Sequence, residues 1–305
     1  MSEQRNNNQL QERKPTASER FTTSIMTQFE AEAGAPMSFT DYERALAQHL
    51  FLKIDSTMKE LEAKRNDNGK PPIVWENVNM RKLALDAVHR IQLGLDALIP
   101  AHIYPVPYLN GKTNKYDIDL RVGYRGELYY RLQSATEKPV DVRLELVYDT
   151  DTFVPVMKDY GNPVESYEFK IKNPFARGNV IGGFAYIMYD DAKRNKLVLV
   201  GEDMFMKSRA DARSKDFWDK YPVEMRYKTL VHRAVSHIEM DPRKVNAPAF
   251  AAVENDSIEM EIDRAANTGS EIIIGNFTED TPELLPVDPD YAESPAEPDS
   301  ADPGF

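Results

Sequence analysis

The 305-residue sequence contains no cysteine. A disulfide framework and any metal site built on thiolates are therefore excluded, which fits a reducing compartment such as the cytoplasm. No run of eighteen apolar residues is present, so we expect no transmembrane helix and no membrane partner. Residues 1–15 are polar and lack the apolar segment of a secretory signal, and we expect them to be disordered.

Signatures of catalysis are also scarce. No GxxxxGK[S/T] segment occurs, which argues against an ATP-binding loop, and no serine lies in a nucleophile-elbow context. His232 and His237 are five residues apart, the wrong spacing for two metal ligands on one helical face. We therefore expect no catalytic residues, no metal site and no enzyme.

One catalytic alternative stays open. Glu168 and Lys170 stand two apart in a predicted strand, and this E-x-K pattern occurs in metal-dependent nucleases. Asp149 or Asp151 would then share a Mg²⁺ ion with Glu168, while the lysine stabilises the attacking water. The same residues also fit the solvated face of an ordinary strand.

The negative charge is concentrated at one end of the chain. The net charge is −12, but residues 254–305 hold fifteen acidic residues and one basic residue, Arg264, a net −14 that leaves +2 for residues 1–253. A basic body with an acidic tail is typical of proteins that bind polyanions, whereas such a tail alone also keeps proteins soluble. An interaction or scaffold protein that works through its tail is the second alternative.

Apolar spacing predicts the order of the elements. Amphipathic helices are predicted from about residue 16, over 40–65 and over 78–95. A turn at 123–126 is followed by a short helix at 127–135, and two closing helices are predicted at 202–210 and 222–239. Strand patterns, which complete an antiparallel meander, occur at 102–109, 117–122, 140–148, 152–157, 167–171, 182–189 and 196–200. This order is that of an α+β fold.

Basic and aromatic residues alternate late in the sequence. Residues 204–244 hold ten basic and six acidic residues, with Phe205, Phe217, Trp218 and Tyr221 among them. Lysine and arginine neutralise phosphates, and aromatic rings stack on unpaired bases. In the last predicted helix, basic residues flank both sides of an apolar stripe, a pattern that an ordinary amphipathic helix shares. The stripe that we expect to be buried consists of Val223, Tyr227, Leu230, Val231, Ala234 and Ile238.

A second basic cluster lies between the predicted strands. Asn110-Gly111 is a strong hairpin signal, and a glycine stands on each side of the Tyr124-Arg125 pair, which allows close approach of another backbone. We expect this hairpin and this turn to lie near one end of the sheet. The cluster comprises Lys112, Lys115, Arg121, Arg125 and Arg131, with Tyr124, Tyr129 and Tyr130.

Three sequence blocks carry a family resemblance. The first is Ile91-Gln92-Leu93-Gly94-Leu95, followed by the extended segment 102–108. The second is Val122-Gly123-Tyr124-Arg125-Gly126, followed by a helix that contains Arg131. The third consists of Trp218, Glu224-Met225, Lys228-Thr229 and Arg233. In this order and spacing, over about residues 80–240, they resemble the RecT family of phage and prophage recombinases.

The resemblance implies a function. Such proteins bind single-stranded DNA and anneal complementary strands without ATP, as rings or helical filaments. It implies no cofactor beyond Mg²⁺ acting through the DNA, a cytoplasmic location in a bacterial host, and a phage exonuclease or host single-strand-binding protein as a partner. The expected fold is an antiparallel sheet on a long helix, like that of the eukaryotic ring-forming annealing recombinases. By carry-over, Arg125, Lys228 and Arg233 line the DNA groove, with Trp218 nearby.

The resulting prediction divides the chain into four parts. These are a disordered N-terminus (1–15), a helical region for oligomer contacts (16–75), a DNA-binding and annealing core (76–245) and a disordered acidic tail (254–305). The predicted DNA-binding residues are Lys112, Lys115, Arg121, Tyr124, Arg125, Lys207, Arg209, Arg213, Trp218, Arg226, Lys228 and Arg233.

Overall fold

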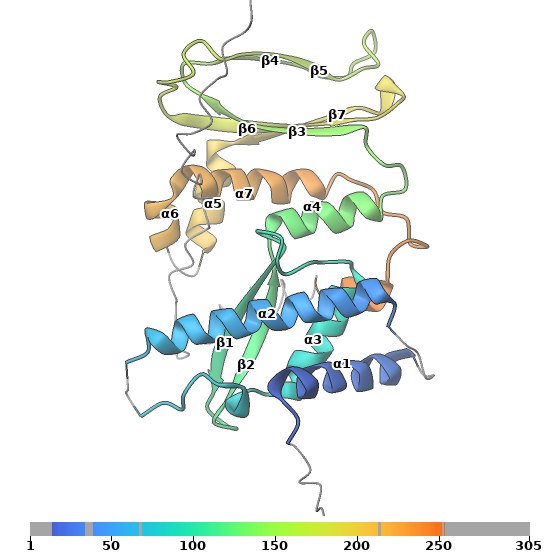
Figure 1. Ribbon diagram of the computed structural model, residues 1–305. Helices are drawn as coiled ribbons and strands as arrows, with labels where there is room; N and C mark the ends of the chain where they lie inside the picture. The colour runs from blue at the N-terminus through green and yellow to red at the C-terminus, as the bar shows by residue number, and fades with distance from the viewer. Residues whose placement is uncertain (1–13, 34–38, 67–68, 213–214, 252, 254–305) are drawn as a thin grey trace, which may run out of the picture. The chain divides into compact units, whose positions relative to one another are not determined.

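Figure 1 shows a computed structural model of the chain. It describes residues 14–33, 39–66, 69–212, 215–251 and 253, all of which lie within one compact unit, Met1–Gly275. The fold is mixed α+β with antiparallel sheets, as predicted. The predicted disorder at 254–305, and at 1–13 within 1–15, falls outside the described residues.

The described elements have the following bounds. The α-helices are α1 (Ala17–Ala33), α2 (Asp41–Ala63), α3 (Met80–Gln92), α4 (Tyr124–Gln133), α5 (Glu202–Asp211), α6 (Asp216–Lys220) and α7 (Pro222–Val235). The strands are β1 (Ile103–Asn110), β2 (Lys115–Val122), β3 (Asp141–Tyr148), β4 (Thr152–Val156), β5 (Ser166–Lys170), β6 (Val180–Met188) and β7 (Lys196–Gly201). Two short 3-10 helices lie at Trp75–Asn77 and Ala192–Arg194.

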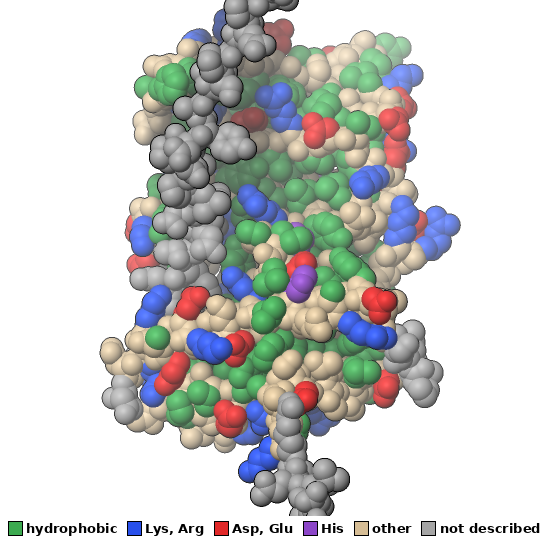
Figure 2. Space-filling model, in the orientation of Figure 1, with side chains coloured by type: hydrophobic (Ala, Val, Ile, Leu, Met, Phe, Trp, Pro, Cys, Tyr) green, Lys and Arg blue, Asp and Glu red, His purple; other side chains and the backbone are tan. Residues whose placement is uncertain are grey.

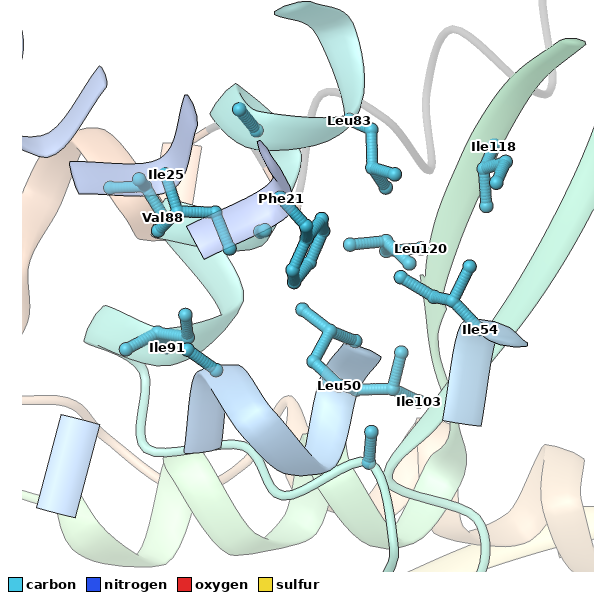
Figure 3. Close-up of a cluster of buried hydrophobic side chains, with 14 of the residues drawn as sticks. Phe21, Ile25, Leu50, Ile54, Leu83, Val88, Ile91, Ile103, Ile118 and Leu120 are labelled. Carbon is cyan, nitrogen blue, oxygen red and sulfur yellow. The ribbon is translucent and has the colours of Figure 1, made fainter. Parts of the chain in front are cut away.

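The first part of the chain builds its core from three helices and one hairpin. A capping box begins α2, in which the Glu43 amide donates to the Thr40 hydroxyl and the Thr40 amide to the Glu43 carboxylate. The apolar faces of α1, α2 and α3 then meet one face of the β1–β2 hairpin around Phe21, which is completely buried. Figure 3 shows these side chains pointing toward one another: Phe21, Ile25, Leu50, Ile54, Leu83, Val88, Ile91, Ile103, Ile118 and Leu120.

The second part is layered on a three-stranded antiparallel sheet of order β3-β6-β7. In Figure 1, α7 and α5 lie on one side of this sheet and the β4–β5 hairpin on the other. Gly183 of β6 allows the close approach of α7, because a Cβ there would lie 3.0 Å from the Leu230 side chain. On the opposite face, the Phe153 ring stacks on Phe184 at 4.7 Å.

The prediction of one antiparallel meander is wrong for the β4–β5 hairpin. The β4–β5 hairpin pairs with itself and not with β3 or β6. Its inward residues Phe153, Tyr167 and Phe169 are aromatic and cover the sheet face. Burial of these rings is gained by folding the hairpin over the sheet rather than extending the sheet edge.

Two helix boundaries also differ from the predictions. Helix α4 begins at Tyr124 rather than 127, because the predicted turn is its first turn and Gly123 is its N-cap. Helix α7 ends at Val235 rather than 239, and Val223, which we predicted to be buried, is 40% exposed. The residues that α7 buries are Thr229, Leu230, Val231, Ala234 and Val235.

An ion pair fastens the loop after β5 to the end of β3. The Arg177 guanidinium donates to Asp151 at 2.6 Å and to the Leu146 carbonyl at 2.9 Å, and lies 4.2 Å from the Tyr148 ring centre. The Asp151 side chain is inaccessible to solvent. Burial raises the pKa of Asp151, but hydrogen bonds from Arg177 and the Tyr148 amide outweigh it and hold the pKa below its ordinary value of 3.8.

This ion pair predicts a pH-dependent contribution to stability. A carboxylate whose folded pKa is lowered stabilises the protein above the unfolded pKa, and that stability is lost as the pH falls through the folded pKa. We expect Asp151→Asn to reduce the free energy of unfolding near neutral pH by about 3 kcal/mol. We also expect the difference in unfolding free energy between the variant and the original protein to shrink as the pH falls from about 4 through the lowered pKa of Asp151. Urea denaturation across this range measures both. Parallel pH profiles for the two proteins would contradict the role of the pair.

Candidate nucleic-acid interface

The N-terminal half of α4 packs against α7. The Tyr124 and Tyr227 rings meet edge to face at 6.1 Å, and the His232 imidazole lies 3.0 Å from the Glu127 carboxylate. Burial is the main cause that raises the pKa of Tyr227, and the nearby Tyr124 adds to it. These contacts join residues more than 100 positions apart, so two of the three blocks of the family resemblance form one surface.

Close backbone packing fixes where α4 begins. A Cβ at Gly126 would lie 2.6 Å from the His102 carbonyl, and one at Gly123 would lie 2.3 Å from the Ala101 carbonyl. Only glycine fits at either position. The His102 ring in turn packs on Tyr129 at 5.2 Å, and burial lowers its pKa. The sequence interpretation of this segment, close approach at paired glycines, is therefore confirmed, although the segment is helical.

Two arginines on this surface face solvent. Arg125 on α4 and Arg233 on α7 are exposed, and neither forms an ion pair with any residue that the structure describes. The Arg125 guanidinium lies 5.9 Å from the Tyr124 ring centre, which leaves most of its donors available. Lys207 on α5 and Lys228 on α7 are exposed as well. A phosphate oxygen can therefore reach Arg125 and Arg233 without first displacing an internal carboxylate.

Other predicted arginines are engaged within the molecule. Arg226 holds Glu202 through two donors and is only 17% exposed. Arg209 is paired with Asp219 at 2.6 Å. Arg121 donates to the Tyr108 hydroxyl and lies 3.9 Å from Asp119. For each of these residues, DNA contact would require exchange of an existing partner.

The hairpin lysines lie away from Arg125. Lys112 and Lys115 are exposed at the tip of the β1–β2 hairpin, whereas Arg125 follows the opposite end, where Ile103 pairs with Val122. Eight paired residues span about 24 Å. The expectation that hairpin and turn share one end of the sheet is wrong, because the chain runs the length of β2 between them.

Trp218 packs inside the protein. It is 3% exposed and lies in a cluster with Phe205 and Leu230 beneath the sheet. Its ring therefore has no free face on which a base could stack in this conformation. Arg213, also predicted to bind DNA, lies outside the described residues.

Charges of both signs are mixed on the surface. Figure 2 shows one face of the molecule, on which lysine and arginine side chains alternate with acidic ones, around a hollow lined largely by hydrophobic side chains. The density of positive charge therefore does not identify candidate phosphate contacts. The arginines without an ion-pair partner among the described residues are the better candidates.

Among the described residues, the acidic residues of the nuclease alternative belong to no cluster of potential metal ligands. Asp151 is occupied by Arg177, and Glu168 stands opposite Val154 on the β4–β5 hairpin. Within the described parts of the chain, no three His, Asp or Glu residues are grouped so as to hold a metal ion. None of the described helices has both the length and the apolar character needed to cross a membrane.

Sequence reasoning missed part of this surface. Tyr227 was assigned to the buried stripe, yet it is half-buried and forms an edge-to-face contact with Tyr124. Glu127 was not singled out, although it pairs with His232. No local pattern reveals either contact, since each depends on α4 and α7 meeting in the folded chain.

Comparison with known proteins identifies a family for this chain. The family model described as the RecT family matches residues 76–263, which is more than half of the chain. A search of curated proteins and a search of solved structures found no match. The matched region includes β1, β2, the helices α4 and α7, and the β3-β6-β7 sheet. The chain therefore belongs to the RecT family, whose members are annealing proteins of phage-type recombination and are generally not catalytic.

Proposed function

We propose that this protein binds single-stranded DNA and anneals complementary strands without ATP, as a homo-oligomer in the bacterial cytoplasm. The observation that carries the proposal is the pair of exposed, unpaired arginines on the α4–α7 surface, within the RecT-matched region. Arg125 and Arg233 are the primary phosphate contacts, and Lys207 and Lys228 are additional ones.

The arrangement suits binding without bond chemistry. Guanidinium groups hold the phosphates of one strand, so its base edges stay free to test a second strand. Base pairing and stacking in the new duplex supply the driving force, which makes nucleotide hydrolysis unnecessary. Mg²⁺ acts by screening the two strands rather than through a protein site. A phage exonuclease, which generates single strands, is the type of partner that such a protein requires.

Oligomerisation converts weak contacts into tight binding. A strand that crosses several subunits gains avidity from each of them, because later contacts form at high effective concentration. Electron microscopy with and without complementary oligonucleotides tests this part of the proposal. Rings or filaments are expected. A protein that stays monomeric while it anneals at full rate would exclude the oligomer.

The phosphate contacts predict a steep dependence on salt. For single strands, the slope of log Kobs against log salt concentration is about −0.7 per neutralised phosphate, so the four proposed contacts of one subunit give about −3. Fluorescence anisotropy with a labelled oligonucleotide of one-subunit length, from 50 to 300 mM NaCl, measures the slope. Binding that is flat across the titration would rule out phosphate contacts as the main source of affinity.

A further inference from the structure

A fully exposed aromatic side chain projects from the loop that joins β5 to β6. Phe175 is 100% exposed, which is unusual for a large apolar ring. The β4–β5 hairpin itself carries further exposed apolar side chains, Val154 and Val156 on β4 and Ile171 directly after β5. Exposed apolar groups gathered in one region of a surface mark an interaction site.

The loop that carries Phe175 is well fastened. The Asn173 side-chain oxygen accepts a hydrogen bond from the Phe175 amide, and the Asn173 carbonyl accepts one from the Ala176 amide. The Thr150 hydroxyl donates to the Arg177 carbonyl at 2.8 Å, next to the Arg177–Asp151 ion pair. A ring displayed by a fixed loop loses little conformational entropy when it binds.

The charge of this loop matches a polyanion. Residues 170–179 contain Lys170, Lys172 and Arg177 and no acidic residue. The two lysines are exposed, and neither forms an ion pair with a residue in the described part of the chain. Sites for single-stranded nucleic acid combine an aromatic ring, which stacks on a base, with basic side chains, which bind the phosphates. The Phe175 loop has both.

The opposite end of the same hairpin provides the contrast. Tyr160, in the loop between β4 and β5, is also fully exposed, and hydrogen bonds from Gly161 and Asn162 to Asp159 order its turn. Residues 157–165 hold one lysine and two acidic residues. The two loops thus share exposure and order but differ in the sign of their charge.

The Phe175 loop lies at the end of the sheet where β3 ends and β6 begins, since Tyr148 pairs there with Val180. The Arg177 guanidinium covers the Tyr148 ring, and Tyr148 packs on the same hydrophobic cluster as Tyr227. Tyr227 in turn contacts Tyr124, the neighbour of Arg125. A strand bound by Arg125 would therefore find the Phe175 loop along the same end of the molecule.

We propose that Phe175, flanked by Lys170 and Lys172, is a stacking site for an unpaired base of single-stranded DNA. This inference rests on the proposed function and adds a second contact to it. The site lies beyond the α4–α7 surface and holds a base, whereas Arg125 and Arg233 hold phosphates. Tyr160 does not take part, because the acidic residues of its loop repel the strand.

Two measurements on the full-length protein test the site. The first is the affinity for a labelled oligo(dT) of the variants Phe175→Ala, Phe175→Trp and Tyr160→Ala. The second is photo-crosslinking to the same oligonucleotide from benzoylphenylalanine placed at position 175 or at position 160. We expect Phe175→Ala to weaken affinity about fivefold or more, Phe175→Trp to retain it, and crosslinks to form from position 175 alone.

The other outcomes each overturn the inference. Equal affinities for Phe175→Ala and the original protein would do so, as would equal losses for Phe175→Ala and Tyr160→Ala. If Phe175→Ala lowers the oligomeric mass and position 175 crosslinks to a second copy of the chain, the loop is a subunit contact. If the original protein binds DNA in all these cases, only this inference fails. If the original protein binds no oligonucleotide, the proposed function fails with it.

Discussion

Reversing the charge of Arg125 and Arg233 together, as Arg125→Glu and Arg233→Glu, is expected to abolish annealing while the protein remains folded. Both side chains are exposed and have no internal carboxylate partner among the described residues, so their loss leaves no buried charge behind. A hydrogen bond to a charged group contributes about 1.5–3 kcal/mol. Two lost contacts, with repulsion of phosphate added, correspond to a loss of affinity of roughly a hundredfold or more.

A matched control separates local contact from overall charge. Arg81 and Lys82 are exposed in the first turn of α3, so Arg81→Glu with Lys82→Glu changes the net charge by the same amount. Annealing of two labelled complementary strands, with circular dichroism as a check of folding, compares the two double variants. If both lose annealing equally, long-range charge and not the α4–α7 surface governs binding. Unchanged annealing in the Arg125 and Arg233 variant would refute these contacts.

Trp218→Ala is expected to lower the free energy of unfolding by about 3–5 kcal/mol. The indole fills the cluster between α5, α6 and α7 and is 3% exposed, so its removal leaves a cavity that the surrounding Phe205 and Leu230 cannot close. Urea denaturation measures the loss. Because this is a large part of the stability of a typical domain, the variant is expected to unfold at a much lower urea concentration.

Trp218→Leu distinguishes a core role from a stacking role. Leucine keeps part of the apolar volume but has no ring, so we expect reduced stability and unchanged DNA affinity in the folded protein. Anisotropy measured well below the unfolding transition provides the comparison. A stable Trp218→Leu variant with weakened DNA binding would show that the indole leaves its cluster to contact DNA.

Periodicity in the sequence predicts most of the elements, but not how they are layered. The strands around Val142–Leu146 and Ile118–Leu120 were found because half-buried strands alternate with a period of two. The placement of the β4–β5 hairpin over the sheet could not be found in this way. Phe153 and Phe169 face each other across the hairpin, and this pattern would fit strands added to the sheet edge equally well. Only their contact with Phe184 shows that the hairpin covers the sheet face instead.

The candidate site shows the same limit. The basic residues of the surface were identified from the sequence, and the family resemblance selected Arg125, Lys228 and Arg233 among them. What the sequence could not show is that Arg226 is paired with Glu202, 24 positions away, while Arg233, one heptad later on the same helix, is exposed. Ion pairing across a fold depends on tertiary distances, which spacing along one helix does not contain.

Helix α4 lies between two hydrophobic clusters, which affects how Arg125 is positioned for DNA binding. Tyr130 belongs to the cluster around Phe21, whereas Leu128 and Leu132 pack on a separate cluster that contains Ile187 and Ala234. A helix held on two sides cannot rock or slide without loosening packing on both. The Arg125 backbone is therefore preorganised before any strand arrives, and binding does not have to offset the cost of ordering it.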